Sequence, residues 1–105
     1  MGKKETLVRE LKKFKVDLGR DVPVQKMILF GSQAKGKTHQ WSDVDLLIVS
    51  SKFKRIKPYK RARGFYDHWT IDKPVDFLCY TPEEFNKLKK SISLVQEIVK
   101  KGVEI

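Results

Sequence analysis

The sequence contains a single cysteine, Cys79, so it can form neither a disulfide bond within the chain nor a metal site made of cysteines. Because Cys79 lies inside an apolar run, we expect it to be a small residue of the core. The sequence also lacks any hydrophobic stretch long enough to cross a membrane. Charged residues occupy the N-terminal segment, where a secretion signal needs an apolar stretch. We therefore expect a cytoplasmic protein with no membrane partner.

Acidic residues are scarce relative to basic ones, with 13 Asp and Glu against 23 Lys and Arg and a net charge of +10. This excess favours polyanion partners such as RNA, DNA, nucleotides or an acidic protein, although a lysine-rich soluble surface would give the same composition. The segment Lys52–Arg63 contains seven basic residues and no acidic one. With its interleaved aromatic residues it is a candidate nucleic-acid track, or else a solvated face whose aromatic residues belong to the core.

The 105 residues suffice for one hydrophobic core, so we expect residues 1–105 to form a single domain. Apolar residues at helical spacing between Leu7 and Leu18 predict an amphipathic helix. Apolar runs at Val24–Phe30, Asp43–Ser50 and Pro74–Tyr80 predict three strands. Below its aspartates the second run is apolar on both faces, which places it centrally in the sheet.

Two further helices are expected. One begins near Pro58 and directs four residues to the core: Tyr59, Ala62, Tyr66 and Trp69. The other begins with Thr81 as its N-cap and Glu84 completing a capping box, and ends at Gly102. Its apolar stripe is Phe85, Leu88, Ile92, Val95 and Val99. The order of elements predicts an α/β fold with a small mixed three-stranded core sheet packed with helices.

Three aspartates carry the candidate chemistry. Asp43 and Asp45 lie two residues apart on a predicted strand, so their side chains leave the same face. Two carboxylates about 4 Å apart repel by roughly 4 kcal/mol at an effective dielectric near 20, which a shared proton or a divalent cation can offset. Asp76 lies in the otherwise apolar third strand and can face this pair if the two strands are neighbours. Asp72, in the turn before that strand, is a competing third carboxylate.

A turn rich in small residues directly follows the first predicted strand. Gly31 allows backbone N–H groups to approach a phosphate, and the hydroxyl of Ser32 adds a donor. Lys35 and Lys37 place positive charge beside them. One loop therefore offers phosphate ligands, while the next strand offers carboxylates for a cation such as Mg²⁺, and a nucleoside triphosphate bound through Mg²⁺ needs both.

These residues carry a family resemblance. A Gly-Ser pair, ten intervening residues and an Asp-x-Asp triplet resemble the signature of minimal nucleotidyltransferases of the DNA polymerase β-like superfamily. The residues that match the fuller signature are Gly31, Ser32, Ala34, Lys35, Gly36, Ser42, Asp43, Asp45 and Leu46. In element order the resemblance covers nearly the whole chain. One departure is Lys35, where arginine is more usual; lysine keeps the charge but loses the bidentate phosphate geometry.

The resemblance implies Mg²⁺-dependent transfer of a nucleoside monophosphate, AMP above all, from a triphosphate to a hydroxyl group. It implies that Gly31, Ser32 and Lys35 bind the triphosphate. Asp43 and Asp45 would bind both of two Mg²⁺ ions, with Mn²⁺ as an alternative, and Asp76 would join the catalytic ion and help activate the acceptor hydroxyl.

The resemblance also suggests a partner. Larger members carry a second domain that closes over the base, for which 105 residues leave no room. Minimal members often pair with a small helical protein of the HEPN type, the toxin of a toxin–antitoxin pair, and the expected acceptor is a hydroxyl on such a partner. Two alternatives remain: a non-catalytic antitoxin that only binds its partner, and a nucleic-acid-binding module that uses Lys52–Arg63.

Overall fold

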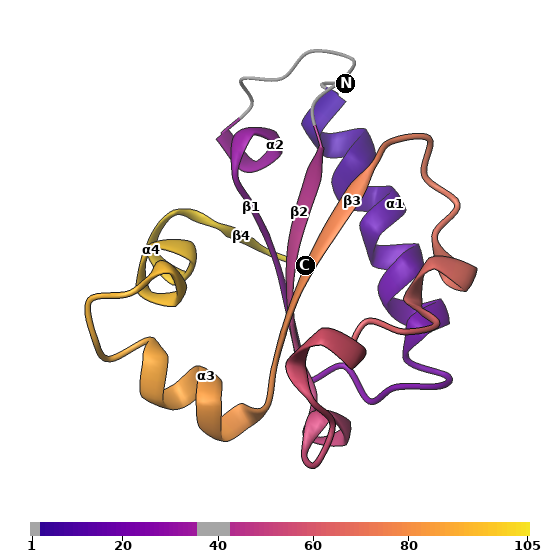
Figure 1. The fold of residues 1–105 in the computed structure, drawn as a ribbon. Coiled ribbons are helices and arrows are strands. Elements are labelled where there is room, and N and C mark those ends of the chain that lie inside the picture. The colour runs from indigo at the N-terminus through magenta and orange to yellow at the C-terminus, as the bar shows by residue number, and fades with distance from the viewer. Residues whose placement is uncertain (1–2, 36–42) are drawn as a thin grey trace.

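The computed structural model describes residues 3–35 and 43–105, shown in Figure 1. Within them the helices are α1 (Lys3–Leu18), α2 (Ser32–Lys35), α3 (Pro82–Leu88) and α4 (Leu94–Lys101). The strands are β1 (Lys26–Phe30), β2 (Val44–Val49), β3 (Val75–Tyr80) and β4 (Val103–Glu104). Three 3₁₀ turns, η1 (Ser51–Phe53), η2 (Pro58–Lys60) and η3 (Phe65–His68), lie between β2 and β3.

The strands form one mixed sheet in the order β3-β2-β1-β4. β2 runs parallel to β3 and antiparallel to β1, and β4 pairs antiparallel with β1. The predicted mixed α/β class and the central position of β2 are confirmed. The sequence did not predict β4, because a two-residue strand is too short to show the alternation of apolar and polar residues that marks a strand.

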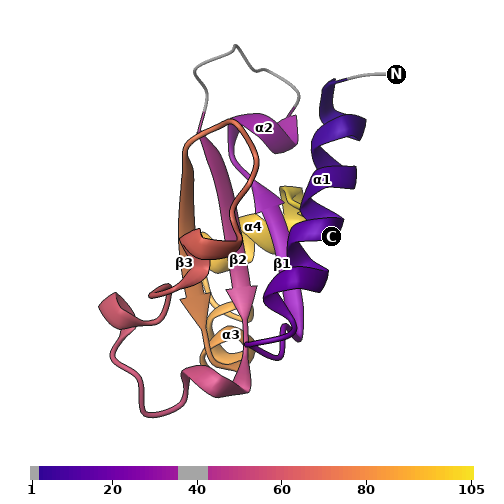
Figure 2. The same cartoon turned by 90° about the vertical axis from the view of Figure 1, so that its right-hand side faces the viewer.

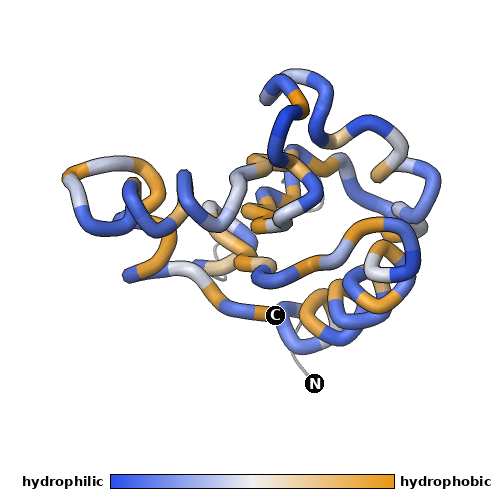
Figure 3. Tube along the Cα trace, turned by 90° about the horizontal axis from the view of Figure 1, so that it is seen from below, coloured by the Kyte–Doolittle hydropathy of each residue, from blue (hydrophilic) through white to orange (hydrophobic). Residues whose placement is uncertain are grey.

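Helices cover both faces of the sheet (Figures 1 and 2). α1 buries Leu7, Leu11, Phe14 and Leu18 in the larger core cluster, as its helical spacing predicted, and Figure 3 shows hydrophobic and hydrophilic positions alternating around this helix. α3 and α4 bury Phe85, Val95 and Ile98 against the opposite face in a second cluster. No helix in residues 3–35 and 43–105 is long and apolar enough to span a membrane.

The prediction of a helix beginning near Pro58 is wrong. Separate 3₁₀ turns occupy this stretch, and Gly64 between them adopts a left-handed φ of 89° that a continuing α-helix does not permit. Tyr59 and Tyr66 are 76% and 58% exposed, while Ala62 and Trp69 are partly buried as expected. The aromatic side chains that fill the core here are Phe53 and Phe65, which are fully buried.

The prediction of a single helix from Thr81 to Gly102 is also wrong, although the predicted helix start at Thr81 is confirmed. The capping box joins the amide of Glu84 to Oγ1 of Thr81 at 3.1 Å and the amide of Thr81 to Oε1 of Glu84 at 2.9 Å. Beyond Leu88 the helix stops, because the Ser93 hydroxyl donates to the Leu88 carbonyl at 2.7 Å and caps α4 instead. Ile92 of the predicted stripe is therefore 99% exposed.

Candidate active site

Strand pairing brings two of the predicted aspartates side by side. Asp45 on β2 is the register partner of Asp76 on β3, and Phe30 on β1 is the partner of Asp45. Register partners project to the same face of a sheet. This is the face that α3 and α4 cover further along, where Leu47 and Val49 are buried. The aspartates lie at the other end of the strand, beyond the two helices.

The carboxylates interact electrostatically. Asp45 is half-buried, whereas Asp43 and Asp76 are exposed. Burial raises the pKa of Asp45, and the negative charges of Asp76 and then Asp43 raise it further. Asp72 is not among these influences, and it lies exposed in the turn before β3. The structure therefore groups Asp76, rather than Asp72, with the other two carboxylates.

The three carboxylates do not form a complete metal-binding site in this structure. Among the described residues, no three His, Cys, Asp or Glu side chains lie close enough together to hold a metal ion. Burial contributes most to the raised pKa of Asp45, and a divalent cation would offset the remaining part, which comes from repulsion by Asp76 and Asp43. Carboxylate oxygens are also the ligands that Mg²⁺ prefers. The donor set at this end of the sheet therefore fits Mg²⁺.

Gly31, in the turn proposed to bind phosphate, lies directly against one of the aspartates. It directly follows β1 with a φ of 76°, a conformation that side-chain-bearing residues rarely adopt. A Cβ at this position would also collide with Oδ2 of Asp45. Ser32 begins the four-residue α2, and Lys35 at its end is exposed. Gly36, Lys37 and Ser42 of the sequence motif lie outside the described residues.

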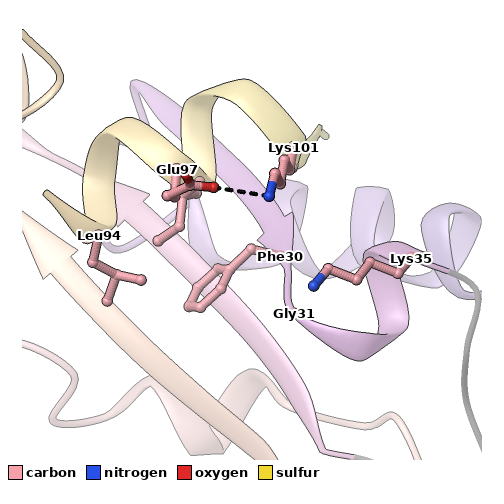
Figure 4. A pocket seen from close by; sticks show the side chains of 8 residues that line it. Phe30, Gly31, Lys35, Leu94, Glu97 and Lys101 are labelled. Atoms are coloured by element: carbon pink, nitrogen blue, oxygen red, sulfur yellow. Dashed lines mark ion pairs between the residues drawn. The ribbon is translucent and has the colours of Figure 1, made fainter. Parts of the chain in front are cut away.

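The structure adds residues that the sequence did not suggest. An open cavity of about 180 Å³ adjoins Gly31 and Lys35 on one side and α4 on the other, where Leu94, Glu97 and Lys101 line it (Figure 4). In the sequence, Lys101 is one of several lysines near the end of a helix, and nothing there indicates that it lies beside the turn at Gly31. Only the packing of α4 against β1 makes this evident.

The basic segment Lys52–Arg63 lies at the far end of the sheet from the aspartates, because it follows β2 whereas Asp45 is near the start of β2 (Figure 1). The six residues of β2 span about 20 Å. The segment therefore cannot line the aspartate site. Of its two aromatic residues, Phe53 belongs to the core, whereas Tyr59 is exposed and remains available to stack on a base.

One member of the basic segment is structural. Arg61 is buried and donates to the carbonyls of Ile56 at 2.9 Å and Cys79 at 3.1 Å. Both of its terminal nitrogens also bond to the Glu84 carboxylate. Arg61 thus ties the segment to β3 and α3 and cannot contact a nucleic acid. Six other basic residues of the segment are exposed: Lys52, Lys54, Arg55, Lys57, Lys60 and Arg63.

A mixed sheet that carries a Gly-Ser turn beside grouped carboxylates has the groups needed by the class of proteins that bind a nucleoside triphosphate through Mg²⁺. Comparison with known families makes this specific. The nucleotidyltransferase domain family matches residues 11–104, nearly the whole chain, and the protein belongs to that family. The predicted family and enzyme class are confirmed, and a nucleoside triphosphate is the substrate that the family implies.

Individual proteins similar to this chain include a curated bacterial protein and a solved archaeal structure. The chain is 30% identical over 97 residues to the probable protein adenylyltransferase MntA of Haemophilus influenzae, covering 90% of this chain and 85% of that protein. Its fold matches the crystal structure of a candidate nucleotidyltransferase from Sulfolobus solfataricus with a TM-score of 0.63. That match covers 99% of this chain and 87% of the other at 24% identity, so it supports the fold alone.

Proposed function

We propose that the protein, acting as a single minimal domain, transfers AMP from ATP to a hydroxyl group on a partner protein. The observation that carries this proposal is the grouping of Asp45, Asp76 and Asp43 next to Gly31 at one end of the sheet. The similarity to a protein adenylyltransferase supports AMP as the transferred group and a protein as the acceptor.

Each motif residue has a role in this proposal. The amide at Gly31, the hydroxyl of Ser32 and the ammonium of Lys35 bind the triphosphate. Asp43 and Asp45 would hold two Mg²⁺ ions, or Mn²⁺ in their place, and Asp76 would join them in holding the catalytic ion. Bound there, the cations neutralise phosphate charge and make the acceptor hydroxyl more acidic. Asp76 is exposed on the edge strand β3, where a hydroxyl on another protein can reach it.

The proposed acceptor is a small helical protein of the HEPN type, for which this chain would act as the antitoxin. The resemblance to minimal nucleotidyltransferases supports this partner, as does the exposure of Asp76. The non-catalytic alternative, an antitoxin that only binds, predicts that the partner is captured equally well when the aspartates are replaced.

The test is transfer of label from ATP radiolabelled at the α-phosphate, with Mg²⁺, to the protein encoded by the neighbouring gene. Asp45→Asn and Asp76→Asn should each reduce transfer by about 100-fold or more, because an amide keeps the shape but loses the ligand charge. Asp72→Asn is the matched control and should change little. Loss with Asp72→Asn but not with Asp76→Asn would refute the assignment of Asp76. Absence of label in every protein tested would favour the non-catalytic antitoxin.

A second function, nucleic-acid binding, is favoured by one observation. Tyr59 lies within the basic segment and is 76% exposed, and the ammonium of Lys60 lies 5.7 Å from the centroid of its ring. Exposed aromatic rings among cations bind single-stranded nucleic acids by stacking and charge. This surface is separate from the aspartate site, so both functions can coexist.

A further inference from the structure

The cavity between α2 and α4 presents two lysines to the same space. Lys35 lines it from the end of α2 and Lys101 from the last turn of α4, with Phe30 of β1 also in the wall (Figure 4). The position of Lys101 is fixed by the backbone that follows it. A Cβ on Gly102 would lie 2.5 Å from the Ile28 side chain and 2.5 Å from the Ile98 carbonyl, so the end of α4 sits directly against β1.

We propose that Lys101 is a second cationic residue of the nucleotide site and binds, with Lys35, the two terminal phosphates of the triphosphate. This inference rests on the proposed function. Asp76, Asp45 and the Gly31 turn follow one another across β3, β2 and β1, and α4 packs beyond them. A triphosphate whose reacting phosphorus lies at the aspartates and whose chain crosses Gly31 delivers its terminal phosphates to this cavity.

Lys101 already has an anionic partner that a phosphate can replace. Its ammonium lies 3.2 Å from Oε2 of Glu97, and the two side chains are 65% and 58% exposed. An exposed ion pair of this kind contributes little stability, so exchanging the carboxylate for a more highly charged phosphate is favourable. Lysine suits this role because its ammonium acts as a point charge with three donors that adapt to the phosphate oxygens.

The two lysines would act on the leaving group. In the transfer, a bond forms between the acceptor oxygen and the α-phosphorus, and the bond from that phosphorus to the α–β bridging oxygen breaks. The electron pair leaves with the pyrophosphate, and the proton of the acceptor hydroxyl is released to solvent. Cations at the terminal phosphates stabilise the charge that grows on the pyrophosphate.

Calorimetric titration of the full chain tests the proposal with three ligands in the presence of Mg²⁺: ATP, inorganic pyrophosphate and AMP. Lys101→Gln should raise the Kd for ATP and for pyrophosphate about tenfold and leave the Kd for AMP unchanged, because AMP lacks the two phosphates. The matched control is Lys100→Gln, which makes the same charge change on an exposed neighbour that does not line the cavity. Unchanged melting temperatures show that the variants fold.

A Glu97→Gln variant should change the affinity for ATP in the opposite direction from Lys101→Gln, or not at all. Removing the competing carboxylate should leave ATP binding equal or tighter, and a clear loss of binding would overturn the proposal.

Equal binding of all three ligands by Lys101→Gln and the parent would also overturn it, and Lys101 would then be an exposed lysine with no role in binding. In that case, label transfer by the parent would leave the proposed function standing. Lys101-dependent ATP binding without label on any protein would support the inference and refute the proposed acceptor. A parent that binds no ATP would refute both.

Discussion

Gly31 and Asp45 are packed so closely that a side chain on the first would displace the carboxylate of the second. The two residues belong to the two halves of the sequence motif, and the antiparallel pairing of β1 with β2 brings them together. The glycine is therefore required twice, for its left-handed backbone and for the space it leaves to the Asp45 carboxylate.

Gly31→Ala should destabilise the protein more than Gly64→Ala does. Gly64 also has a positive φ, 89°, but a Cβ there meets nothing within 4 Å, so its replacement costs only backbone strain of about 1 kcal/mol. At Gly31 the Asp45 carboxylate must also turn out of its position, which should add about 0.5–1.5 kcal/mol. Chemical denaturation of both variants measures the difference.

The same collision predicts coupling between the two residues. In a double-mutant cycle, Gly31→Ala combined with Asp45→Ala should cost at least about 0.5 kcal/mol less than the sum of the single changes. Additive effects, or equal destabilisation by Gly31→Ala and Gly64→Ala, would show that the Asp45 carboxylate does not limit the space at residue 31.

Asp45→Asn should leave the metal-free protein at least as stable as the parent. Burial and the charges of Asp76 and Asp43 raise the pKa of Asp45, so its ionised form opposes folding at neutral pH, and an amide removes that cost. Adding Mg²⁺ with ATP at 100 times its Kd should stabilise the parent by about 2.7 kcal/mol and leave the variant nearly unmoved. Thermal melts with and without ligand measure both effects. If the variant is destabilised and the melting temperature of the parent does not change with ligand, Asp45 has a structural role and does not bind metal.

Arg61→Gln and Glu84→Gln should each destabilise the protein by about 1–2 kcal/mol, since each leaves the other side chain of a partly buried pair without its partner. The control is Arg63→Gln, an exposed position where we expect a change within about 0.5 kcal/mol. Equal effects at residues 61 and 63 would contradict the structural role of Arg61.

The same pair predicts a pH dependence. The hydrogen bond from Arg61, with help from the Thr81 amide, lowers the pKa of Glu84 below its ordinary value, although burial opposes this. Its contribution to the free energy of unfolding is therefore complete above the ordinary glutamate pKa and is lost as pH falls through the lowered one. Denaturation of the parent and Glu84→Gln at neutral and acidic pH should show the difference between them shrinking in acid.

The exposed basic surface should bind single-stranded RNA independently of catalysis. Replacing Lys57, Lys60 and Arg63 with glutamine should weaken binding of an RNA oligomer and reduce the salt slope of log K by about 0.7 for each phosphate that the protein no longer neutralises. The control is the same three-charge change on α1, at Lys4, Lys12 and Lys13. Equally weakened binding by both triple variants would mean that only net charge matters, and the segment would then be a solvated face.

The sequence by itself determined what local patterns can encode. Alternation and apolar runs marked the three main strands, the spacing from Leu7 to Leu18 marked α1, and Thr81 with Glu84 marked the start of α3. These signals are reliable because each depends on residues within a few positions of one another. The motif from Gly31 to Asp45 likewise identified the family, because its members are close in sequence.

Tertiary structure alone decided which distant residues meet. The register that places Asp45 beside Asp76 depends on parallel pairing across the long segment between β2 and β3, and the burial of Arg61 depends on Glu84 reaching it from α3. Lys101 joined the neighbourhood of Gly31 only because α4 packs on β1. The basic segment is remote from the aspartates because the extended strand β2 lies between them. Pairing register and burial are properties of the whole packed sheet, and no local window of sequence contains them.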